Sequence, residues 1–165
     1  MNFHGVSALA AGCLLAANGA SLAAGLEGSA VTVTAYCCSA PIESDRFTEP
    51  AAATVGAGVE FPSGSIVTIG YDLIESSIDV SAFAIDLRYA ETSTAANAPF
   101  NGYGFDFSGL GAQRIAAVVL NPLSTFAPGS VGLTFHADSV FYSASGLSFT
   151  PDSGILIDVT VAPVP

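Results

Sequence analysis

Lysine and tryptophan are absent from this chain, and arginine, its only strongly basic residue type, occurs three times. Against them stand 14 acidic residues, so the 165-residue chain carries a formal net charge of −11 at pH 7. Nucleic-acid binding depends on Lys and Arg at the phosphates, and anionic lipid surfaces attract basic segments. The charge balance therefore argues against a nucleic-acid-binding protein and disfavours an anionic membrane surface as a partner.

Long apolar runs are also missing from residues 25–165, where none approaches the roughly 20 residues that a membrane-spanning helix requires. The chain is nevertheless 51% hydrophobic and only 10% charged, which is far from the composition of a disordered protein. A domain of this size buries about two-thirds of its unfolded surface. We therefore expect a folded protein that requires no disulfide or metal to hold it together.

The N-terminus carries a continuous stretch of small and apolar residues, GVSALAAGCLLAANGASLAA, over residues 5–24. Polarity returns after it, and the segment 21–23 has the small-x-small pattern of a signal-peptidase site. We predict a signal peptide over residues 1–24 and a single domain over residues 25–165. The alternatives are a buried N-terminal helix, which the Gly and Ala content disfavours, and lipid attachment at Cys13, which we do not expect.

Apolar residues of the mature chain recur at every second position, as they do in half-buried strands. Turn signals such as Asn101-Gly102 separate these runs at a spacing of roughly 8–12 residues. We predict an all-β fold, an antiparallel β-sandwich of jelly-roll-like type with about eight to ten strands, and a closed barrel is the alternative. One alternating run covers residues 67–71. The residues expected between the sheets are Phe83, Ile85, Leu87, Phe105, Phe107, Leu133, Phe135, Ile155, Ile157 and Val159, and those expected on the opposite faces are Asp86, Arg88, Asp106 and Asp158.

The mature chain has few residue patterns that would support catalysis. A serine hydrolase needs a histidine beside its nucleophile, yet residues 25–165 contain one histidine, His136, and no G-x-S-x-G motif. His136 shares the polar side of its run with Gly132 and Thr134, as a solvated strand histidine does. A single histidine also argues against a zinc site.

Carboxylates are plentiful, but their spacing does not show which of them converge as glycoside hydrolysis requires. We interpret them as solvated acids on strand faces: Asp72, Glu75, Asp79, Asp86, Asp106 and Asp158. Calcium suits an exported acidic protein, yet no D-x-D-x-D-G loop is present, and residues 152–154 are typical of a turn. In the absence of tryptophan, the side chains left to stack on a sugar are Tyr36, Tyr71, Tyr89, Tyr103 and Tyr142. We assign no catalytic, cofactor-binding or metal-ligating residue.

Cys37 and Cys38 are adjacent in a strand-like run. Neighbouring side chains of a strand point to opposite faces, so a bond between them would distort the strand. Two buried thiols or a bond to another chain are the alternatives. We expect no structural disulfide here.

Three segments resemble parts of small exported β-proteins of Gram-negative bacteria, namely TVGAGVEF at 54–61, GYGFDF at 102–107 and HADSV at 136–140. The chain ends in Val164-Pro165, and in proteins of the PEP-CTERM class a Val-Pro step leads into Glu-Pro-Ser, a membrane helix and an arginine-rich tail that an exosortase processes. That tail is absent from this sequence, so we expect release in soluble form after signal cleavage. The resemblance implies an exported protein of the cell surface or matrix without known catalysis.

These observations favour an exported, non-enzymatic structural or interaction protein, with extracellular polysaccharide or surface proteins as its partners. The alternative is a carbohydrate- or calcium-binding β-sandwich module, and a hydrolase comes third. No cofactor is expected, and no membrane span is expected in the mature chain.

Export gives the first prediction. Because the apolar segment ends near Ala24, the secreted protein should begin between Ala24 and Glu27. N-terminal sequencing of periplasmic or secreted material measures this directly. A product that remains cytoplasmic and begins at Met1 would contradict it.

Overall fold

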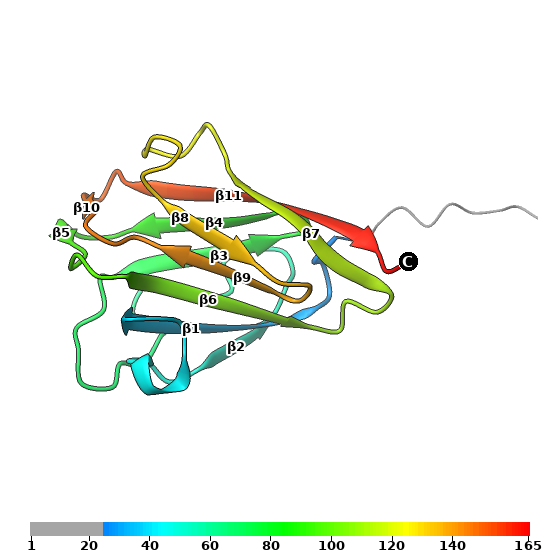
Figure 1. Cartoon of the computed structure of the whole chain (residues 1–165), viewed down its shortest axis with the longest axis horizontal. Helices are drawn as coiled ribbons and strands as arrows, with labels where there is room; N and C mark the ends of the chain where they lie inside the picture. Colours follow the sequence, from blue (N-terminus) through cyan, green and yellow to red (C-terminus); the bar gives the residue numbers. More distant parts are fainter. Residues whose placement is uncertain (1–24) are drawn as a thin grey trace, which may run out of the picture.

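The computed structural model describes residues 25–165, and the predicted signal peptide with Cys13 lies outside the described residues. The regular secondary structure of the described part is made up of strands and one turn of 3-10 helix, η1 (Glu43–Asp45). Antiparallel sheets pack against each other, which confirms the predicted all-β sandwich (Figure 1). Within residues 25–165 no helix is long and apolar enough to cross a membrane.

Two larger sheets and one small sheet make up this fold. The five-stranded sheet has the order β2 (Ala51–Thr54), β1 (Ala30–Cys38), β6 (Phe100–Ser108), β9 (Ser139–Ser143) and β8 (Gly132–Phe135). The four-stranded sheet has the order β3 (Ser76–Ser81), β4 (Ala84–Tyr89), β11 (Gly154–Pro163) and β7 (Gln113–Leu120). The remaining strands, β5 (Ser93–Thr94) and β10 (Ser148–Phe149), pair with each other at one end of the sandwich. This two-residue pair brings the strands of the described part to eleven, slightly above the eight to ten expected.

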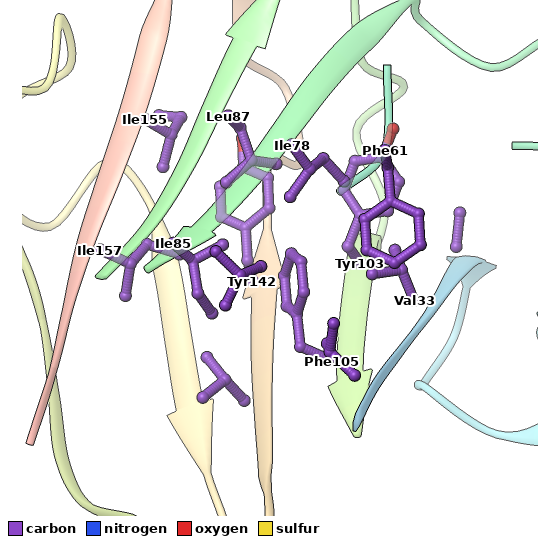
Figure 2. Close-up of a cluster of buried hydrophobic side chains, with 14 of the residues drawn as sticks. Val33, Phe61, Ile78, Ile85, Leu87, Tyr103, Phe105, Tyr142, Ile155 and Ile157 are labelled. Carbon is purple, nitrogen blue, oxygen red and sulfur yellow. The ribbon is translucent and has the colours of Figure 1, made fainter. Parts of the chain in front are cut away.

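The core lies between the two larger sheets, where alternate residues of each strand point inward. In the β1–β6 pair, Val33 lies opposite Phe105 and Val31 opposite Phe107, and all four side chains are buried. Figure 2 shows residues of β4 and β11 facing residues of β6 and β9 across this core. The core residues that β4 and β11 contribute are fully buried, namely Ile85, Leu87, Ile155 and Ile157.

Most of the predicted core is confirmed. Seven of the ten side chains are buried, namely Ile85, Leu87, Phe105, Phe107, Ile155, Ile157 and Val159. Leu133 is partly buried against the core, but Phe83 and Phe135 are 53% and 39% exposed, so those two predictions are wrong. Phe83 lies in the turn before β4 and Phe135 is the last residue of an edge strand, and the alternation of a strand does not hold at its ends.

The residues expected on the solvent faces are placed as predicted. Asp106 is exposed on β6, and Asp86 and Arg88 share the outer face of β4. The Arg88 Nη2 donates to the Asp86 Oδ2 at 2.9 Å, and the Arg88 Nε lies 2.8 Å from the Asp86 Oδ1. The Arg88 side chain is exposed and the Asp86 side chain is half-buried, and such an ion pair near the surface contributes about 0–1 kcal/mol to stability.

Tyrosine hydroxyls form the polar part of the core. The hydroxyls of Tyr89 and Tyr142 are 2.9 Å apart, and the Tyr103 hydroxyl lies 3.1 Å from the Ser76 hydroxyl. Burial raises the pKa of Tyr103 to about 12 and raises the pKa of Tyr89 and that of Tyr142 above the ordinary tyrosine value. The three phenols are therefore held in their neutral, hydrogen-bonded form.

The register of β6 gives a stability prediction. Phe107→Ala removes a buried ring and should lower the free energy of unfolding by about 3–5 kcal/mol. Asp106→Ala, at the neighbouring exposed position, should change it little. Urea midpoints measure both, and equal midpoints for the two variants would contradict the register.

The buried phenols predict a loss of stability in alkali. A tyrosine of the unfolded chain ionises near pH 10, whereas Tyr89, Tyr103 and Tyr142 ionise at higher pH in the folded chain. The folded state thus binds more protons above pH ~10, so the free energy of unfolding should be constant up to that pH and fall beyond it. Chemical denaturation at pH 8 to 12 tests this, with Tyr103→Phe as the control that weakens the dependence. Stability that does not decline above pH ~10 would refute the assignment.

Candidate functional site

Strand β1 ends and β6 begins at the end of the sandwich that also carries β5 and β10 (Figure 1). Three neighbouring hollows lie at this end. Their volumes are about 190, 240 and 370 Å³. Asp72 lines the first and second hollows, while Cys37 and Tyr71 line the second and third. We call these three neighbouring hollows together the loop-end groove.

Tyr71 lies between the second and third hollows and lines both of them. The segment before it pairs with the chain next to β1, because the Glu49 N–H donates to the Val67 carbonyl at 2.8 Å and the Ile69 N–H donates to the Phe47 carbonyl at 2.6 Å. Gly70 then turns the chain with a φ of 90°. The Tyr71 ring meets the buried Phe47 edge to face, with centroids 6.1 Å apart, while 67% of the residue remains exposed. One aromatic contact therefore orients a ring that still faces solvent.

A disulfide between Cys37 and Cys38 forms one wall of the groove, so the expectation of no structural disulfide is wrong. That expectation assumed a regular strand, in which neighbouring side chains point apart. Here the Cys37–Cys38 peptide bond is cis and the Cα atoms are 3.1 Å apart, which places both sulfurs on one side. Both cysteines line the third hollow, and Cys37 also lines the second.

The floor of the third hollow is held by Asp45. Its carboxylate accepts hydrogen bonds from the Ser39 N–H at 2.9 Å, from the Ala40 N–H at 3.0 Å and from the Ser39 hydroxyl. These bonds, the one from the Ser39 hydroxyl first, lower the pKa of Asp45 below its ordinary value. The Asp45 carboxylate therefore stabilises the turn that follows the disulfide.

Two other charged groups of the groove, Arg46 and Glu75, also interact with the chain itself. Arg46 lies 3.3 Å from the Glu43 carboxylate and 4.0 Å from that of Glu49. Glu75, in the first hollow, accepts a hydrogen bond from the Ser63 hydroxyl at 3.2 Å. Asp72 is exposed and lies between the first two hollows, where its carboxylate faces solvent.

Of the six carboxylates considered for glycoside hydrolysis, the structure brings Asp72 and Glu75 into the loop-end groove. Asp79 lies opposite Asp86 in the β3–β4 register, and burial, together with the nearby carboxylates, raises the pKa of Asp79. Asp158 accepts the Asn121 side-chain amide at 2.8 and 2.9 Å. Asp72 and Glu75 thus share one hollow, whereas Asp79, Asp86, Asp106 and Asp158 are not among the residues that line the groove.

His136 is exposed, as predicted, and its ring packs edge-on against Phe141 with centroids 5.8 Å apart. Asp152 and Ser153 lie in the turn before β11, in which the Ser153 N–H donates to the Thr150 carbonyl at 2.8 Å, and Gly154 is the first residue of β11. Among residues 25–165, no group of three or more His, Cys, Asp or Glu side chains is placed to hold a metal ion.

The five tyrosines named for sugar stacking separate into three environments. Tyr89, Tyr103 and Tyr142 are buried, Tyr36 is half-buried, and Tyr71 is exposed in the groove. The alternation over residues 67–71 predicted a strand with one face inward, but Val67 and Ile69 are 64% and 42% exposed. Gly70 was the available signal that this alternation breaks before Tyr71, whereas no sequence pattern indicated the contact with Phe47.

In comparisons with known proteins, no protein-family model, curated protein or solved structure matches the chain.

Asp45 gives a pH prediction for the groove. The pKa of Asp45 is lowered in the folded chain. The stabilisation of the turn by Asp45 should therefore be fully present above the ordinary aspartate pKa of about 3.9, and it should be lost as pH falls through the lower folded value. The amide resonances of Ser39 and Ala40, followed by NMR from pH 7 to 2, should move with a midpoint below 3.9. Asp45→Asn should abolish that titration. A midpoint at or above 3.9 would contradict the assigned hydrogen bonds.

Proposed function

We propose that this chain is an exported, non-enzymatic protein of the cell surface or extracellular matrix, and that it acts by binding through the loop-end groove. The observation that carries the proposal is the exposed Tyr71, fixed against Phe47 between two hollows. Binding sites are concave and combine apolar or aromatic surface with a few polar groups on a rigid frame. The groove has this composition, and the end of the β1–β6 pair contributes Cys37 and Asn101 to its lining.

Several features support binding rather than catalysis. His136 has an aromatic neighbour and lies outside the groove. Asp45 and Glu75 accept hydrogen bonds from their own chain, so they serve as structural acceptors. The resemblance to the PEP-CTERM class and the predicted signal peptide support the exported location, and both remain predictions.

The carbohydrate-binding alternative is favoured by one specific observation, the exposed aromatic ring beside polar groups, and it is developed below. The calcium-binding alternative has no comparable support among the described residues, where no set of three ligating side chains converges.

The location can be tested by expressing the full chain with a C-terminal epitope in a Gram-negative host and treating intact cells with a protease. We expect the epitope in the medium or on the cell surface. A variant with Leu14→Arg and Leu15→Arg, which interrupts the apolar segment, should keep the protein inside. Cytoplasmic retention of the unmodified chain would refute the proposal.

A further inference from the structure

We infer that the loop-end groove binds a neutral polysaccharide, with one sugar ring stacked on Tyr71 and its hydroxyls bonded to polar groups of the adjoining hollows. This inference rests on the proposed function, since it names the ligand class of the same site.

The first argument is the shape of the groove. The second hollow shares Asp72 with the first and shares Cys37 and Tyr71 with the third, so it neighbours both of the others. Tyr71 stands between two of them and exposes its ring. A chain molecule fits such a surface, with successive units seated in successive hollows on either side of the ring.

The second argument is the chemistry of the lining. A sugar ring presents a face of C–H groups and a rim of hydroxyls, so it requires an aromatic or apolar platform beside hydrogen-bonding groups. The middle hollow supplies the Tyr71 ring and the Cys37 sulfur as apolar surface, and Ser93, Thr94 and Asn101 as polar groups. The Asn101 amide already donates to the Ala96 carbonyl at 3.0 Å, which holds its side chain at the rim.

The third argument is charge. The chain has a formal net charge of −11, and Arg46, the arginine that lines the groove, is shared between Glu43 and Glu49. An anionic polysaccharide would therefore be repelled. Asp45 and Glu75 accept hydrogen bonds from their own chain, whereas Asp72 is exposed and lines two hollows. The Asp72 carboxylate is therefore the acceptor offered to sugar hydroxyls, and the cationic polysaccharide in the test below decides whether the acidic charge selects a cation instead.

Binding of the purified protein should be measured against neutral polysaccharides of gluco, galacto and manno configuration: cellulose, a β-1,3-glucan, dextran, a galactan and a mannan. Alginate and chitosan serve as the anionic and cationic comparisons, and an extended neutral peptide library tests the protein-ligand reading. We expect retention on at least one neutral polysaccharide and little change in that retention between low and moderate salt.

Three variants, each compared with the unmodified protein, distinguish a role of Tyr71 in sugar stacking from a role in stability. Tyr71→Ala should weaken binding at least about tenfold, which corresponds to about 1.4 kcal/mol, with its urea midpoint unchanged. Tyr71→Phe keeps the ring and should bind within about threefold of the unmodified protein. Phe83→Ala removes another half-exposed ring, outside the groove, and should bind as the unmodified protein does.

Tyrosine absorbance supplies an independent readout. The chain has no tryptophan, and Tyr71 is the one tyrosine among residues 25–165 with a mostly exposed side chain. A bound sugar should therefore produce a tyrosine difference spectrum that is absent in Tyr71→Ala.

The inference is overturned if no neutral polysaccharide of the panel binds, if only alginate, chitosan or peptides are retained, or if Phe83→Ala loses binding as Tyr71→Ala does. These outcomes are independent of the export test. A protein found at the surface that fails to bind the panel refutes the ligand class alone, and a cytoplasmic protein that binds it refutes the location alone.

Discussion

The ladder between β1 and β6 is the interaction on which the rest of the structure depends. It runs in register from the Ala30–Ser108 pair to the Cys38–Phe100 pair, so it spans the full length of both strands. Its inner face supplies Val31, Val33 and their partners to the core. Its last pairs place Cys37 beside Asn101, which are two walls of the loop-end groove. Core and groove are therefore positioned by one set of backbone hydrogen bonds.

Strand centres were predictable because burial between two sheets imposes a period of two on the side chains. Phe105, Leu87 and Ile157 follow that rule and are fully buried. Phe83 does not, because it belongs to a turn, where the chain leaves the sheet and its alternation ends. Periodicity thus identified the all-β sandwich and failed at strand termini.

The groove was less predictable because its parts come together only in three dimensions. Tyr71 could be listed as a tyrosine but not separated from the other four, since exposure depends on what covers a residue from elsewhere in the chain. Its partner Phe47 is 24 residues earlier, and the pairing of residues 47–49 with 67–69 has no local sequence signal. The disulfide was missed because the rule of alternating side chains was applied to a peptide bond that departs from regular strand geometry.

Polar groups are used differently in the two regions. In the core, tyrosine hydroxyls pair with each other and with Ser76, which satisfies them away from water. In the groove, Asp45 and Glu75 satisfy groups of their own loops and so give irregular chain a defined shape without strand pairing. The fold therefore fixes its loops with carboxylates, which is consistent with a sequence rich in acids and poor in bases.

The two ends of the described chain lie at the same end of the sandwich, opposite the groove (Figure 1). Leu26 donates to the carbonyl of Ala82 in the β3–β4 turn, and Val164 donates to the carbonyl of Ala112 in the β6–β7 turn, at the end of the sandwich opposite β5 and β10 (Figure 1). The nine residues of β1 alone span roughly 30 Å between these ends. The molecule is therefore polar along its length: attachment to a support near Gly25 or Pro165 would leave the opposite end, with the groove and Tyr71, directed away from the support. Neighbouring copies attached to a support in this way would form a layer whose Tyr71 rings face the medium on the side away from the support.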